Sequence, residues 1–141
     1  MIYLIACSAT KLDKAAPACD LYQGQAFKAA RKLAEKSRAE YWILSAKYGL
    51  IHPDTVTAPY NDYLGAMTKA QRTIWGAMVC EQIKAAGLTS RAAVILAGKH
   101  YAAPIAHLFP ALDLPLAGLG IGQQLSKLKQ LNQGAPCNPS Q

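Results

Sequence analysis

The stretch MIYLIACSATK, residues 1–11, passes from six apolar residues into small hydroxylated residues and a lysine. The apolar run predicts a strand that is buried on both faces, as the strands of parallel sheets usually are. The run is too short, and too poor in preceding basic residues, to be the core of a signal peptide. The residues after Ala6 therefore predict a loop at the carboxyl end of a first strand.

Three later runs predict the other strands of this sheet. Residues 41–45 (YWILS) and 92–97 (AAVILA) are almost entirely apolar and predict two more buried strands. The weaker run at 111–116 (ALDLPL) predicts an edge strand, because Pro115 cannot donate a hydrogen bond to a neighbouring strand.

Apolar residues at helical spacing predict helices between these strands. The helices cover residues 23–37, 68–87 and 120–131, and a short helix follows the turn at 98–101. Thr68, with Gln71 three residues later, has the pattern of a capping box. In the second and last helices, the residues expected to face the core are Ile74, Trp75, Met78, Val79, Ile83, Ile121, Leu125, Leu128 and Leu131.

Strands that alternate with helices predict a three-layer α/β/α domain with a parallel sheet. We expect one domain over residues 1–132 and a disordered tail over residues 133–141. Sheets of this kind bind ligands outside the carboxyl ends of their strands. The loops expected there cover residues 7–14, 46–62, 98–101 and 117–120.

The composition indicates which partners and which cellular compartment to expect. The formal net charge is +7 and the isoelectric point is about 9.3, which favours anionic partners such as phosphates, nucleotides or nucleic acid. The four cysteines form no CxxC pair and the three histidines have no metal-ligand spacing, so we expect a reduced cytoplasmic protein without a metal or cofactor. No run approaches the ~18 apolar residues of a membrane span.

The first loop offers candidate ligand-binding residues in Cys7, Ser8 and Lys11. Small residues after a strand can hold an anion through backbone N–H groups, and a lysine adds charge. A turn with surface hydroxyls is the alternative. Cys7 is interpreted as a structural thiol rather than a nucleophile, since no partner histidine is evident.

The second loop carries the candidate catalytic residues Asp54, Lys47 and Tyr48, with Tyr60 and Asp62 as substrate-binding residues. Tyrosines can stack on a base, a lysine can pair with phosphate, and a carboxylate near an anomeric carbon can activate water. The alternative is that both aspartates only form turns.

The last two loops add Lys99, Tyr101, Gly120 and Gln123 as substrate-binding candidates. Glycines before a helix allow an anion to approach its N-terminus, and a glutamine can read a base edge. Solvent-exposed surface is the alternative. The glycines at 118–122 do not have the spacing of a dinucleotide fingerprint.

One basic helix face is a candidate for contact with a nucleic-acid backbone. It carries Lys28, Arg31 and Lys32 with few acids. Such faces are often only solvated.

The motifs together resemble a family of small bacterial and phage domains. They are CSxxK near the N-terminus, LYxGxxF at 21–27, SAKYGL at 45–50, and Pro-Asp and Pro-Tyr at 53–54 and 59–60. That family is similar to the YaaA peroxide-stress proteins and, distantly, to the uracil-DNA glycosylase-like fold. The resemblance implies a four-stranded parallel sheet, for which we expect the order 2-1-3-4.

The resemblance also implies nucleic-acid or nucleotide handling, with DNA favoured over RNA. We expect metal-independent N-glycosidic cleavage of a natural or modified base. The alternatives are a non-catalytic DNA-binding module and a nucleotide or nucleotide-sugar transferase or hydrolase. The chain lacks the GxDPY-type and HPSP-type segments of uracil-DNA glycosylases. Ordinary uracil excision is therefore not expected.

Overall fold

The computed structural model describes residues 1–134, which form a central sheet with helices on both faces. In chain order the elements are β1 (Ile2–Ala6), β2 (Ala16–Pro17), α1 (Ala18–Leu21), α2 (Gln25–Lys36), β3 (Glu40–Ser45), β4 (Gly49–Ile51), β5 (Val56–Thr57), η1 (Leu64–Ala66), α3 (Lys69–Ala85), β6 (Ala93–Leu96), α4 (Lys99–Ala102), η2 (Ala106–Leu108), β7 (Leu112–Asp113) and α5 (Ile121–Gly134).

The main sheet has the order β4-β3-β1-β6-β7. The pairs β3–β1, β1–β6 and β6–β7 are parallel, so the four parallel strands follow the expected order 2-1-3-4. The prediction of a four-stranded, all-parallel sheet is wrong, because β4 pairs antiparallel with β3 at the edge. Gly49 has a φ of 76°, and this left-handed conformation lets the chain turn back beside Ser45 within four residues.

The free edge of β4 is covered by a side chain of α3. The Gln82 amide accepts a hydrogen bond from the Leu50 N–H at 2.8 Å and donates one to the Tyr48 carbonyl at 3.0 Å. A Cβ at Gly49 would overlap this amide, so a glycine is needed there for space as well as for conformation.

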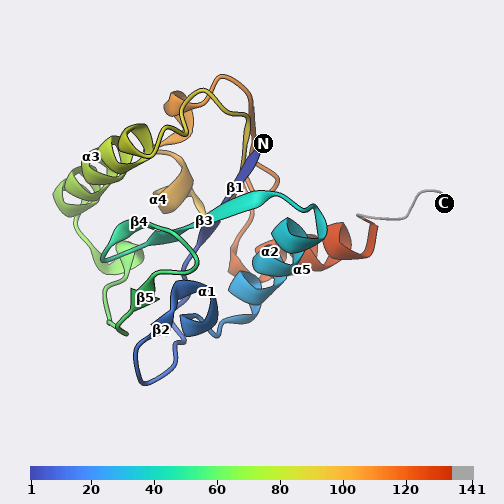
Figure 1. Ribbon diagram of the computed structural model, residues 1–141, viewed down its shortest axis with the longest axis horizontal. Coiled ribbons are helices and arrows are strands. Elements are labelled where there is room, and N and C mark those ends of the chain that lie inside the picture. The colour runs from blue at the N-terminus through green and yellow to red at the C-terminus, as the bar shows by residue number, and fades with distance from the viewer. Residues whose placement is uncertain (135–141) are drawn as a thin grey trace.

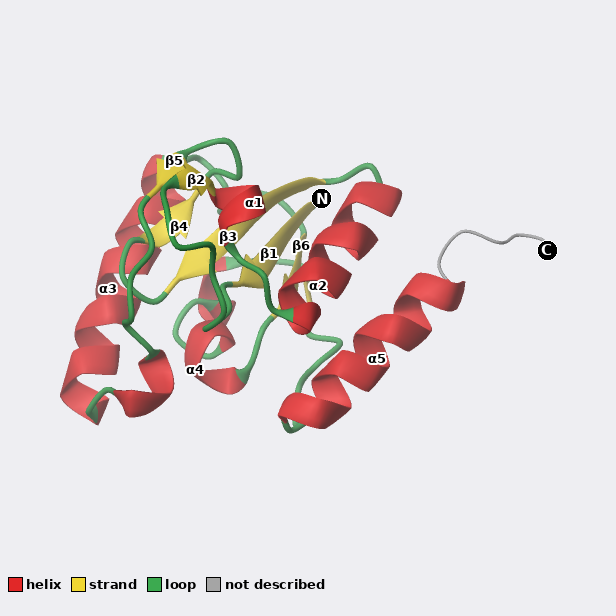
Figure 2. Ribbon diagram, turned by 90° about the horizontal axis from the view of Figure 1, so that it is seen from below, coloured by secondary structure: helices red, strands yellow, loops and turns green. Residues whose placement is uncertain are grey.

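The helices form two layers, as expected for an α/β/α domain. Figure 2 shows the strands between α3 and α4 on one side and α2 and α5 on the other. In Figure 1 the helix α5 lies alongside α2, and the two helices contact each other. A second, two-stranded sheet pairs β2 with β5, of which β5 lies within the loop predicted at residues 46–62 and β2 follows the loop predicted at residues 7–14.

Most of the residues predicted to face the core are buried or partly buried. Trp75, Val79 and Ile83 of α3 are buried, but Ile74 is 71% exposed and Met78 is 37% exposed. Helix α3 packs on the edge strand β4, so only a narrow stripe of its surface is covered. In α5 the prediction for Leu128 is confirmed and that for Ile121, which is 78% exposed, is wrong because Ile121 is the first residue of the helix.

The ends of the helices agree closely with the sequence prediction. Thr68 caps α3 in a capping box with Gln71. Helix α5 continues to Gly134, so residues 133 and 134 are helical rather than part of a tail. The rest of the predicted tail, residues 135–141, lies outside the described residues. Within residues 1–134, the structure contains no helix with the length and apolarity needed to cross a membrane.

The two isoleucines of α3 provide a matched test of this packing. We expect Ile83→Ala to lower the free energy of unfolding by about 2–5 kcal/mol, because Ile83 is fully buried and its loss leaves a cavity. Ile74→Ala, the same change at an exposed position of the same helix, should cost less than about 0.5 kcal/mol. Urea denaturation measures both, and similar losses in the two variants would contradict the packing of α3.

Candidate functional site

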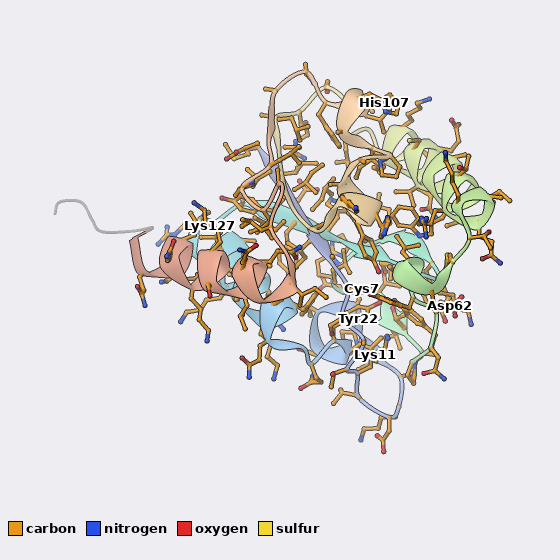
Figure 3. The ribbon with its side chains drawn as sticks, turned by 180° about the vertical axis from the view of Figure 1, so that it is seen from behind. Cys7, Lys11, Tyr22, Asp62, His107 and Lys127 are labelled. Carbon is orange, nitrogen blue, oxygen red and sulfur yellow. The ribbon has the colours of Figure 1, made fainter. Side chains whose placement is uncertain are left out.

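The carboxyl ends of three neighbouring strands bring the candidate residues together. Cys7 follows β1, Ser45 ends β3, and Tyr101 lies in α4 shortly after β6. The chain then adds Tyr22 from the end of α1 and Tyr60 from the segment after β5. In Figure 3, Cys7, Tyr22 and Lys11 lie near one another at this end of the sheet. We refer to Cys7, Tyr22, Ser45, Tyr60 and Tyr101 as the tyrosine cluster.

Ser45 begins a chain of buried hydroxyl groups. Its Oγ accepts hydrogen bonds from the backbone N–H groups of Lys47, at 3.2 Å, and Tyr48, at 3.0 Å. It donates to the Tyr60 hydroxyl at 2.7 Å, and the Tyr22 and Tyr60 hydroxyls are also 2.7 Å apart. The three hydroxyls therefore form one connected chain, in which either tyrosine can donate to the other.

Burial keeps these hydroxyls neutral. Tyr22 is 1% exposed and burial raises its pKa to about 12. Burial is also the main cause that raises the pKa of Tyr60, and the hydrogen bond with Tyr22 adds to it. Both side chains therefore act as neutral hydrogen-bond donors at physiological pH.

The half-buried thiol of Cys7 lies against a third tyrosine. Cys7 Sγ is 3.4 Å from the Tyr101 hydroxyl. Burial raises the pKa of Tyr101, and the neighbouring Cys7 raises it further. The Tyr101 ring packs edge-on against Trp75, whose Nε1 donates to the Ser45 carbonyl at 2.9 Å. Trp75, predicted only as a core residue, thus connects α3 to this site.

Two lysines among the predicted site residues lie over tyrosine rings. Lys11 Nζ is 4.3 Å from the centre of the Tyr60 ring, and Lys47 Nζ is 5.4 Å from the centre of the Tyr48 ring. The Tyr48 and Tyr60 rings themselves meet edge-to-face at 5.4 Å. Contact with aromatic faces holds the ammonium groups at the rim of the cluster, where they favour an anionic ligand.

Ser8 is used within its own loop. Its Oγ accepts a hydrogen bond from the Gly24 N–H at 3.1 Å and donates to the Thr10 carbonyl at 2.8 Å. A Cβ at Gly24 would lie 2.7 Å from Ser8 Cβ, so the glycine allows this close approach. The Ser8 hydroxyl therefore fixes the first loop, and nothing shows it facing a ligand site.

The structure separates the two candidate aspartates. Asp54 is 86% exposed on its side chain, lies 3.8 Å from His52 Nδ1, and affects the pKa of Tyr41 near the start of β3. The chain after β4 has thus run back from the carboxyl edge, and Asp54 is not brought to the tyrosine cluster. Asp62 is exposed and lies two residues after Tyr60. Two residues further on, Leu64 begins η1, which contacts α4, the helix that carries Tyr101. Asp62 therefore lies on a segment bounded on both sides by contacts with the cluster.

The remaining candidates take different positions. Lys99 is exposed on α4, next to the cluster residue Tyr101. Gln123 accepts a hydrogen bond from the Gly120 N–H at 3.0 Å and so caps α5. Gln124, by contrast, lies close to Gly98, directly after β6.

The basic face of α2 is only partly available. Arg31 forms ion pairs with Glu35 at 2.8 Å and Asp20 at 3.3 Å, and also donates to the Cys19 carbonyl at 2.6 Å. Lys28 and Lys32 are exposed on the same helix. The structure thus leaves these two lysines as the accessible cations of the predicted face.

Sequence reasoning did not select Tyr22 and Ser45 as site residues. Ser45 was visible as a polar residue that ends an otherwise apolar strand, but the bond to Tyr60 depends on a chain reversal that the sequence did not reveal. Tyr22 was visible only as part of a motif. Among residues 1–134, no three His, Cys, Asp or Glu side chains gather in a way that would hold a metal ion.

A comparison with protein-family models gives one match, over residues 2–130, to a family of unknown function, DUF6884. The chain belongs to the DUF6884 family. The match covers nearly all of the described residues of this DUF6884 protein, including the whole tyrosine cluster. Neither the curated proteins nor the solved structures that were compared gave a match.

The hydroxyl chain should contribute measurably to stability. We expect Tyr60→Phe to lower the free energy of unfolding by about 1–3 kcal/mol, because buried Ser45 and Tyr22 each lose a hydrogen-bond partner. Tyr48→Phe, at a ring that is 36% exposed, should change it by less than about 0.5 kcal/mol. Urea denaturation compares them, and an equal effect of both variants would refute the buried chain.

The raised tyrosine pKa values also predict how stability depends on pH. Tyr22 ionises near pH 10 when unfolded and at about pH 12 when folded. The unfolded state therefore loses its proton first, and stability should fall as the pH rises from about 10 to about 12. We expect Tyr22→Phe to make the fall shallower, while Tyr41, Tyr60 and Tyr101, whose pKa values are also raised, retain part of it. Denaturation across this range measures the slope, and an unchanged slope would contradict the assignment.

Proposed function

We propose that this protein processes nucleotides or nucleic acid and hydrolyses the N-glycosidic bond of a base, on a uracil-DNA glycosylase-like fold. The order of its parallel strands, with helices on both faces, supports a fold of this kind. The SAKYGL segment and the Pro-Tyr pair, which carry the resemblance to YaaA-type domains, place Ser45 and Tyr60 in one hydrogen bond. DNA is a more favoured substrate than RNA, and no cofactor is part of the proposal.

The observation that carries the proposal is the combination of cations, rings and neutral donors at one edge of the sheet. Tyr48, which is 36% exposed, offers accessible ring surface on which a base can stack. Tyr101 is half-buried, with its ring edge-on against Trp75. Tyr60 is only 8% exposed, so it supports Tyr48 edge-on rather than stacking on the base itself. Lys11 and Lys47 offer charge for a phosphate.

The chemistry requires a water molecule and a carboxylate. Water attacks the anomeric carbon while the bond to the base nitrogen breaks, and the carboxylate accepts the proton from the water. The departing base gains electron density, which nearby neutral hydroxyl donors and lysines stabilise. We assign the carboxylate to Asp62 rather than to Asp54, the residue expected from the sequence, because Asp62 lies next to the cluster along the chain and Asp54 lies beside His52.

A mass-spectrometric screen for released bases tests this function. Purified protein is incubated with natural and modified DNA, RNA and nucleotide pools. We expect one free base to appear with the wild type and with Asp54→Asn, and to be lost with Asp62→Asn. The two variants remove the same charge from exposed aspartates, so they are matched controls.

Two results would count against the proposal. Equal release from both variants would refute the role of Asp62. No release from any pool, together with measurable binding to DNA, would favour a non-catalytic DNA-binding module. That second candidate is favoured by one observation: both aspartates are exposed, so neither carboxylate is enclosed in surroundings that exclude bulk water.

A further inference from the structure

A basic groove lies between α3 and the segment that contains α4 and η2. It encloses about 530 Å³, and five of its lining residues can carry positive charge: Lys69, Arg72, Lys99, His100 and His107. No aspartate or glutamate lines it. Figure 3 shows His107 on the side of α4 that is turned away from Cys7 and Lys11. We call these five residues and the hollow between them the basic groove.

The charge of the groove is not neutralised by the protein. In the described part of the chain, none of its five basic residues forms an ion pair with a carboxylate. Arg72 is oriented by backbone carbonyls, donating to Met67 at 2.5 Å and to Leu64 at 3.3 Å. Arg72 and Lys99 contribute to a lowered pKa of His100, after the larger effect of burial. Such a positive field attracts phosphate groups.

Close packing below the groove fixes its shape. A Cβ at Gly76 of α3 would lie 2.8 Å from the Pro104 Cβ, so a glycine is required for the two segments to come this close. Cys80 Sγ donates to the Pro104 carbonyl at 3.4 Å in the same contact. The lysines at the two walls are therefore held apart by a rigid floor.

The groove and the tyrosine cluster share one wall. In α4, Lys99 and His100 line the groove, while the next residue, Tyr101, contacts Cys7 in the cluster. Lys69 and Arg72 of α3 form the opposite wall, in the helix whose Trp75 packs on Tyr101. A ligand that fills the groove thus lies one helix away from the site proposed for the base.

We propose that the basic groove binds the phosphodiester backbone of a single strand of nucleic acid whose target base enters the tyrosine cluster. This inference rests on the proposed function and selects the polymer over the free nucleotide as substrate. A hollow of this volume has the size of a small-molecule pocket, which fits a short length of one strand. Enzymes that act on bases commonly work on such unpaired strands.

Fluorescence anisotropy with a labelled single-stranded DNA tests the groove without requiring turnover. The first variant is Lys69→Gln/Lys99→Gln, which spares Arg72 because Arg72 supports the turn before α3. The matched control is Lys14→Gln/Lys129→Gln, which removes the same charge from two exposed lysines that do not line the groove. Both proteins keep the same net charge, so only the position of the change differs.

We expect the groove variant to weaken binding about tenfold and the control to stay within about twofold of the wild type. The slope of log affinity against log salt should fall by about 1.4 in the groove variant, since each lost contact to a single strand removes about 0.7. A duplex of the same sequence should bind more weakly, and a mononucleotide should compete only at much higher concentration.

Several outcomes would contradict the proposed role of the groove. They are failure of the wild type to bind a single strand, equal weakening by the two variants, and weakening by the control alone. Competition by a mononucleotide at the same phosphate concentration as the strand would also contradict it. The anisotropy experiment measures binding and the mass-spectrometric screen measures base release, so the two proposals are tested independently. A protein that releases no base but loses binding only in the groove variant would refute the proposed reaction and retain the groove.

Discussion

The buried hydroxyl of Ser45 is the contact on which the working end of this molecule depends. Ser45 is fully buried at the end of β3, and it binds the loop that follows through two backbone N–H groups. Its hydroxyl donates to Tyr60, and its carbonyl accepts from Trp75 of α3. One residue therefore positions the loop that follows it and two segments that lie 15 and 30 residues further along the chain. A buried polar group of this kind is stable only while every partner is present.

This dependence explains why the site and the basic groove form a unit. Trp75 connects Ser45 to α3, and its contact with Tyr101 connects α3 to α4. The close approach of Gly76 and Pro104 then fixes the same two segments below the groove. A change in the packing of α3 would move the rings of the cluster and the lysines of the groove together.

The sequence predicted the elements that depend on local pattern, and missed those that depend on the path of the chain. Apolar runs predicted the four parallel strands, and Thr68 with Gln71 predicted the start of α3. β4 was missed because three residues that begin with a glycine carry too little pattern to indicate a strand. That omission affected the site as well: Asp54 and Asp62 look equivalent in sequence, and only the reversal at Gly49 carries Asp54 away from the carboxyl edge.

The amide of Gln82 also affects how one copy of the protein can associate with another. An edge strand ordinarily offers unpaired N–H and C=O groups to any other strand that approaches it, and this is a common route to aggregation. Here one side chain occupies both the Leu50 N–H and the Tyr48 carbonyl, as a sixth strand would. The opposite edge, β7, is only two residues long and is followed closely by Pro115. Both borders of the sheet are thus poor templates for another chain, which favours a protein that stays dispersed at high concentration.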